Sequence, residues 1–261
     1  MIGYVTMGMA LVPMVAPMIG GALDHAFGWE AVFWMLTLAG LGVFVLAWFD
    51  QGETARGGGI GFADQFREYP ELFTSRRFWG YVFAAAFASG AFFAFLGGGP
   101  YVAQVEYGLS SFWAGVCFGA PAVGYTLGNY ISGRYSVRFG INWMIRTGAM
   151  IGFSGLAVAS LLTALGQGSA LLFFGFCCFV GLGNGLTIPN ATAGLLGVRP
   201  HLAGTASGIG GAILLGFGAF LAALAAPSDG DTEFPLALIM ALTSVASIGA
   251  ILYVMQVAKR T

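Results

Sequence analysis

The chain has 261 residues, of which 58% are hydrophobic and only 8% are charged, and its formal net charge is −1. An average soluble domain carries about 25% charged residues, so this chain lacks the charged groups that a soluble exterior requires. The composition therefore excludes an ordinary soluble enzyme, a nucleic-acid-binding protein and a disordered chain, and it indicates a polytopic helical membrane protein.

Long apolar stretches follow one another along the whole sequence. A bilayer core of about 30 Å requires about 20 apolar residues in a helix, whereas a β-barrel strand needs only about ten that alternate. Eight stretches meet the helical requirement: 1–23, 28–49, 79–101, 111–133, 143–165, 169–194, 202–226 and 234–257. We expect an all-α membrane protein with eight transmembrane helices. Most connections are short, so we also expect successive helices to be antiparallel neighbours.

The charged residues predict the orientation of these helices. If the eight spans alternate in direction, every basic residue falls on one side of the membrane: Arg56, Arg67, Arg76, Arg77, Arg134, Arg138, Arg146, Arg199, Lys259 and Arg260. The connections on the other side contain acidic residues but no lysine or arginine. Because basic residues remain cytoplasmic, we expect a multi-pass membrane protein with both termini in the cytoplasm.

Two further regions bear on organisation. Met1 already lies within an apolar stretch that has no basic flank, which suits either a short natural N-terminus or a chain that begins partway through a larger bundle. The longest connection, 50–78, places Phe62, Phe66, Tyr69 and Phe73 at helical spacing. It predicts a short amphipathic helix in the inner interface.

Enzymatic chemistry finds no support in the residue pattern. The two histidines, His25 and His201, fall on opposite sides of the predicted membrane, and no nucleophile–base set accompanies either. The three cysteines lie inside spans, without the spacing of metal ligands. The glycine-rich stretch 181–185 follows an apolar span rather than a strand, so it is no nucleotide-binding loop. We expect no enzyme, no metal and no cofactor.

A resemblance to the major facilitator superfamily begins in the first stretch. Gly3, Pro17, Gly20 and Gly21 match the antiporter motif in the fifth helix of that superfamily's exporters, although Val12 and Ala16 replace two of its glycines. A proline removes a backbone hydrogen bond and kinks the helix. Paired glycines allow a neighbouring backbone to approach closely.

A second motif lies between the fourth and fifth predicted spans. Residues 133–140 resemble the superfamily's loop signature: Gly133, Arg138 and Gly140 match it, but Val137 stands where the signature has Asp. Counted from the antiporter motif, this position corresponds to the connection between the eighth and ninth helices. Stretches such as 76–81 and 188–192 are similar to multidrug exporters of the Bcr/CflA type.

The resemblance implies a domain organisation in which roughly the first four of twelve helices are missing. Residues 1–49 would be the last two helices of the N-terminal half, 50–78 the cytosolic loop between the halves, and 79–261 the complete six-helix C-terminal half. The implied function is drug or small-molecule efflux by proton antiport in the complete protein. A carrier for another metabolite and an inactive fragment remain the alternatives.

The resemblance also implies that the spans at 79–101, 111–133, 169–194 and 202–226 line half of a substrate cavity near the midplane. Seven polar candidates for substrate binding follow from this: Asn184, Asn129, Tyr125, Thr187, Asn190, Tyr101 and Gln104. Asn184 ranks first because it lies deepest, and Phe92, Phe93 and Phe95 would add apolar surface for amphipathic drugs. The competing interpretation is that the Asn and Thr side chains only join helices by hydrogen bonds.

Proton coupling requires an ionisable group within the membrane. None lies in the middle of a predicted span, so we expect this chain alone to catalyse no proton-coupled efflux.

Overall fold

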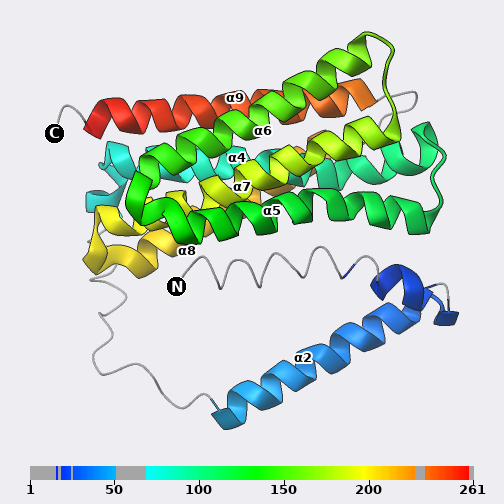
Figure 1. Cartoon of the computed structure of the whole chain (residues 1–261). Coiled ribbons are helices and arrows are strands. Elements are labelled where there is room, and N and C mark those ends of the chain that lie inside the picture. Colours follow the sequence, from blue (N-terminus) through cyan, green and yellow to red (C-terminus); the bar gives the residue numbers. More distant parts are fainter. Residues whose placement is uncertain (1–15, 17–18, 25, 51–68, 227–232, 259–261) are drawn as a thin grey trace.

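The protein is all-α over the residues that its computed structural model describes, which are 16, 19–24, 26–50, 69–226 and 233–258 (Figure 1). Helix α2, Glu30–Asp50, lies apart from a bundle of long helices. The bundle consists of α4 (Arg76–Tyr101), α5 (Ser111–Phe139), α6 (Ile141–Ala164), α7 (Ala170–Val198), α8 (Ala203–Leu224) and α9 (Glu233–Ala258). A π-helical segment, η1 (Val102–Glu106), continues α4, and a 3-10 turn, η2 (Pro200–Leu202), precedes α8.

Seven of the eight predicted spans are helices at their predicted positions. By length and hydropathy, six described helices qualify to cross a membrane: α2, α4 with η1, α6, α7, η2 with α8, and α9. Helix α5 has 29 residues but falls outside this group because its composition is less apolar. The predicted span 1–23 lies largely outside the described residues. The exact count of eight therefore stays a prediction.

Helix α2 is apolar on every side. None of its residues is buried, and large side chains such as Trp34, Phe44 and Trp48 are exposed. A helix with no polar face needs hydrocarbon or another apolar surface around it. Its composition thus suits a membrane environment.

Glycines determine how closely the helices of the bundle approach one another. Helix α7 is packed between α5 and α6, with Gly181 and Gly185 on the α5 side and Gly183 on the α6 side. A Cβ atom added to Gly185 would lie 2.5 Å from the carbonyl oxygen of Tyr125, and one added to Gly183 would lie 2.5 Å from that of Gly148. Backbones can touch in this way only where side chains are absent. The stretch 181–185 is therefore a two-sided packing surface.

The expectation that successive helices are neighbours holds for α6 and α7 but is wrong for the other main interfaces. The most extensive contacts join α5 with α7, α6 with α7, α4 with α9, and α4 with α8. A short loop limits only the distance between helix ends, whereas close packing along the helices requires matching small residues. If α4, α5 and α6 are matched in order with α7, α8 and α9, the contact of α5 with α7 corresponds to that of α4 with α8. The contact of α6 with α7 likewise corresponds to that of α4 with α9. The bundle thus consists of two three-helix units with equivalent mutual contacts.

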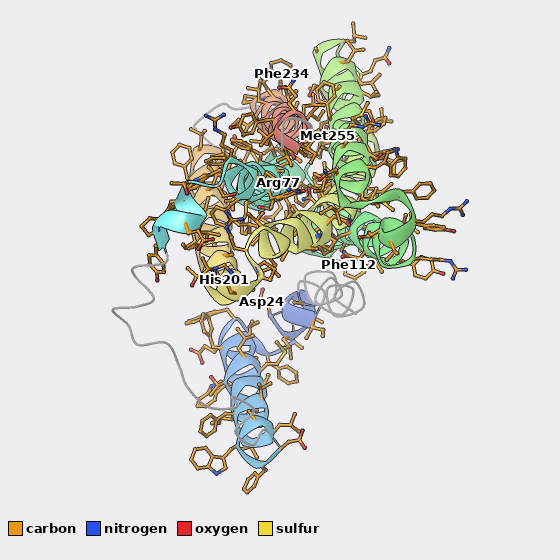
Figure 2. The ribbon with its side chains drawn as sticks, turned by 90° about the vertical axis from the view of Figure 1, so that its left-hand side faces the viewer. Asp24, Arg77, Phe112, His201, Phe234 and Met255 are labelled. Carbon is orange, nitrogen blue, oxygen red and sulfur yellow. The ribbon has the colours of Figure 1, made fainter. Side chains whose placement is uncertain are left out.

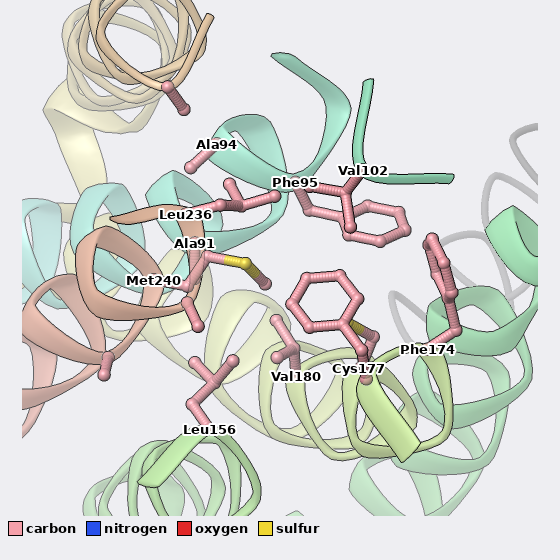
Figure 3. Close-up of a cluster of buried hydrophobic side chains, with 14 of the residues drawn as sticks. Ala91, Ala94, Phe95, Val102, Leu156, Phe174, Cys177, Val180, Leu236 and Met240 are labelled. Atoms are coloured by element: carbon pink, nitrogen blue, oxygen red, sulfur yellow. The ribbon is translucent and has the colours of Figure 1, made fainter. Parts of the chain in front are cut away.

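The bundle has an apolar cluster towards each end and a layer of small and polar residues between them. One cluster contains Phe95, Val102, Phe174, Leu236 and Met240 (Figure 3). The other contains Phe78, Tyr81, Ile145, Leu195 and Val254. The intervening layer includes Ser89, Asn184, Thr187, Ser244 and Ser247, all of which are buried. This layer is the part of the bundle where buried polar groups could form a site midway along the helices.

We predict that Gly185→Ala destabilises the protein, because the added methyl group would collide with the α5 backbone. Overpacking of this kind costs about 1–3 kcal/mol. The matched control is Gly175→Ala on the same helix, where an added Cβ meets nothing within 4 Å. Thermal unfolding of the purified variants in detergent should show a lower melting temperature for Gly185→Ala alone. Equal melting temperatures would contradict the proposed packing.

Candidate substrate-binding site

The central polar layer encloses a small cavity between α4, α6, α7 and α9. Its polar lining comes from Asn184, Thr187, Ser244 and Ser247, and its volume is about 10 Å³. Such a volume holds about one water molecule. The cavity therefore belongs to the interior of the six-helix bundle and is far too small for a drug-sized ligand.

Asn184, the first-ranked candidate, lies at this cavity and is only 6% exposed. Thr187 also lines it and is fully buried, and its hydroxyl donates to the carbonyl oxygen of Ile145 on α6 at 3.4 Å. These two are the members of the predicted set that the structure brings together around a cavity.

Asn190 and Asn129 lie at the interface of α5 and α7. The Asn190 amide donates to the hydroxyl of Ser132 on α5 and to the carbonyl oxygen of Leu186, each at 2.8 Å. Asn129 is fully buried, and its amide donates to the carbonyl oxygen of Tyr125 at 2.9 Å. Asn190 thus joins two helices, which is the role that the competing interpretation assigns to polar residues in membranes.

The remaining candidates are more accessible. Tyr125 is half-buried on α5, and Tyr101 is half-buried at the last residue of α4. Gln104 is exposed in η1. Ala88 of α4 lines the cavity beside Asn184, so Gln104 lies roughly 20–25 Å further along the helix at 1.5 Å per residue. The seven candidates therefore do not surround a single described pocket.

The expected apolar surface of α4 is partly core. Phe95 is 1% exposed and packs against Phe118 and Phe174, with ring centroids 4.7 and 5.9 Å away (Figure 3). Phe92 and Phe93 are half-buried. The spacing of aromatic residues along one helix could not distinguish these environments, because the rotation of α4 in the bundle decides them.

Sequence reasoning missed the polar residues of α9. The Ser247 hydroxyl donates to the carbonyl oxygen of Ala84 on α4 at 2.9 Å, and Ser244 lines the cavity. Their spacing of three residues places both on one face of a helix. This spacing could have indicated a polar face on α9, but the family resemblance implied a cavity lined by other helices.

The two family motifs occupy different surroundings. Gly3 and Pro17 lie outside the described residues. Gly20 and Gly21 belong to a described helical segment, where an added Cβ would meet nothing within 4 Å. The close approach of a neighbouring backbone at these glycines is therefore absent within the described part of the chain, because no described helix packs there.

The second motif is not a loop. Residues 133–139, including Gly133 and Arg138, form the last turns of α5, and only Gly140 makes the turn to α6. Gly140 has φ +85°, a conformation that favours glycine and ends the helix. Val137 is 97% exposed in the position where the signature has Asp.

Basic residues gather at one end of the bundle, which Figure 2 views directly. Arg77 begins α4, Arg138 ends α5 and His201 precedes α8, so the antiparallel arrangement places all three at this end. A cluster that the sequence did not reveal lies here too: Glu71 pairs with Arg199 at 2.6 Å and with His201 at 3.3 Å. Because these groups are about half exposed, the pairs contribute about 0–1 kcal/mol at most.

The comparisons with known proteins agree with this membrane architecture. The family model described as Major Facilitator Superfamily matches residues 1–223. The chain is 30% identical over 247 residues to a bicyclomycin resistance protein homolog of Haemophilus influenzae, covering 94% of this chain and 62% of that relative. It is 26% identical over 222 residues to a chloramphenicol resistance protein of Pseudomonas aeruginosa, covering 83% and 52%.

A third relative matches a shorter region. The multidrug transporter MdfA of Edwardsiella piscicida is 30% identical over 156 residues, which are 59% of this chain and 38% of that protein. The chain therefore spans about 60% of the length of the curated relatives that it matches most extensively. The family model covers far more than half of the chain and describes transporters rather than enzymes, so this protein belongs to the Major Facilitator Superfamily.

Proposed function

We propose that this chain contributes to the export of drugs or similar small amphipathic molecules across the bacterial inner membrane. The observation that carries the proposal is its similarity to a bicyclomycin resistance protein homolog over 94% of the chain. Further relatives are named as a chloramphenicol resistance protein and a multidrug transporter. In the complete protein, we propose that export is coupled to protons by antiport.

The packing of the bundle supports the proposed domain organisation. Each half of a facilitator consists of two three-helix repeats, and α4–α6 and α7–α9 have equivalent mutual contacts. We therefore propose that residues 79–261 form the C-terminal half, that 1–49 belong to the N-terminal half, and that 50–78 connect the two. The basic end of the bundle would then face the cytoplasm, with both chain termini on that side.

Expression of the complete gene in a bacterial host without its own drug exporters tests the efflux proposal. We expect higher minimum inhibitory concentrations for bicyclomycin, chloramphenicol or other amphipathic drugs than in cells with the empty vector. A protonophore should abolish the difference in drug accumulation if protons drive export. Unchanged inhibitory concentrations for all the drugs tested, or a change only for a nutrient analogue, would contradict drug export. The second result would favour a carrier for another metabolite.

We predict that the 261-residue chain alone does not export drugs in response to a proton gradient. The reason is that none of the predicted spans carries an acidic or basic group in its middle, where protonation could be coupled to movement. The measurement is drug uptake into sealed proteoliposomes with an imposed pH gradient, with protein-free vesicles as the control. Sustained gradient-dependent transport would contradict the prediction.

We predict that helix-joining residues and substrate-contacting residues respond differently to substitution in the complete gene product. Asn190→Ala removes the amide that bonds Ser132, at a cost of about 0.6–1.7 kcal/mol for a membrane hydrogen bond. It should reduce protein abundance and resistance to every transported drug in proportion. Tyr125→Ala, at a half-buried position, should instead change the relative resistance to different drugs at similar abundance.

The comparison of resistance profiles, normalised to protein level by immunoblot, distinguishes these cases. Asn184→Ala is the third member of the series, because the residue lines the interior cavity. A drug-selective change in Asn184→Ala would support its proposed substrate contact, and a uniform change would exclude that role.

A further inference from the structure

The turn between α5 and α6 carries arginines that have no carboxylate partner among the described residues. Arg134 and Arg138 are four residues apart on α5, so their side chains share one face of the helix, and both are exposed. Arg146 lies in the second turn of α6, directly after the turn at Gly140. Within the described residues, no carboxylate pairs with any of these three arginines. The exposed Arg134 and Arg138 are thus available to anionic groups outside the described part of the chain.

Aromatic rings link the two helices at this turn. Phe139 of α5 stacks on Trp143 of α6 with a centroid distance of 4.9 Å, and the Arg138 guanidinium lies 5.4 Å from the Phe139 ring centre. Trp143 precedes Arg146 by three residues, so both lie on neighbouring positions of one α6 face. Trp143 and Phe139 are both exposed. Tryptophan beside basic residues is typical of the boundary between hydrocarbon and headgroups.

Two further details concern the surroundings of these arginines. Val137 lies one turn from Arg134 and is 97% exposed, so this position of the motif supplies no acidic group to Arg134. The Nε atom of Arg146 is buried and has no hydrogen-bond partner among the described atoms. Arg199, at the same end of the bundle, forms an ion pair with the Glu71 carboxylate.

We propose that Arg134, Arg138 and Arg146, with Trp143 and Phe139, bind the phosphate of an anionic phospholipid headgroup; we call these five residues the turn cluster. Guanidinium groups bind phosphate oxygens through paired, charge-assisted hydrogen bonds. Basic pockets between helices on the cytoplasmic side of a membrane suit anionic headgroups, and the adjacent rings suit the upper acyl chain. This site is independent of the drug that the protein exports.

The test measures lipid bound to the purified full chain in detergent by native mass spectrometry. Phosphatidylglycerol is the probe, and phosphatidylcholine and phosphatidylethanolamine are the reference lipids. We expect one phosphatidylglycerol molecule to be retained in clear preference to the reference lipids. R134Q/R138Q should lower its apparent affinity by about fivefold for each arginine removed. V137D should also weaken retention, because it adds a carboxylate one helical turn from Arg134.

The matched control is R76Q/R77Q, which removes the same charge at the same end of the bundle, at the start of α4. It should leave phosphatidylglycerol retention unchanged. An equal loss of phosphatidylglycerol retention in R76Q/R77Q and R134Q/R138Q would show a non-specific attraction of the lipid to positive charge, and it would overturn the proposal. Equal retention of phosphatidylglycerol and phosphatidylcholine by the unchanged chain would overturn it as well. Displacement by millimolar inorganic phosphate would identify a free-anion site and overturn the assignment to lipid. Size-exclusion chromatography verifies folding, and V137D tests the same site without removing an arginine.

Discussion

The packing of the bundle depends on direct backbone contact between α7 and its two neighbours, α5 and α6. Gly181 and Gly185 bring α7 against α5, and Gly183 brings it against α6, at separations that any side chain would prevent. In a membrane, apolar side chains gain little by leaving lipid for protein, so close packing and interhelical hydrogen bonds must hold the helices together. This requirement explains why glycine makes up about a sixth of the chain.

The same close approach determines what the polar side chains can do. Once α5 and α7 touch, the Asn190 amide reaches Ser132, and once α6 and α7 touch, the Thr187 hydroxyl lies near the carbonyl of Ile145. A small cavity with Asn184 remains between four helices. The layer thus joins the helices of the bundle to one another through buried polar groups.

Two of the groups of basic residues at one end of the bundle have different surroundings. Arg199 and His201 pair with Glu71, which attaches the segment before α4 to the turn between α7 and α8. The arginines around the α5–α6 turn have no such carboxylate among the described residues, and one of them, Arg138, lies over the ring of Phe139, which stacks on Trp143. One group is positioned by the protein itself, and the other is available to the membrane surface.

The sequence by itself determined the class of protein and the positions of seven helices, because a helix in lipid must satisfy a local requirement of length and apolarity. Its motifs also indicated the family. It also indicated the basic end of the bundle. Only the tertiary structure decided which helices touch, that residues 133–139 are helical, and that Phe95 is core while Asn190 joins two helices. These features depend on the rotation of each helix about its axis. Sequence periodicity cannot specify that rotation when a helix is apolar on all sides.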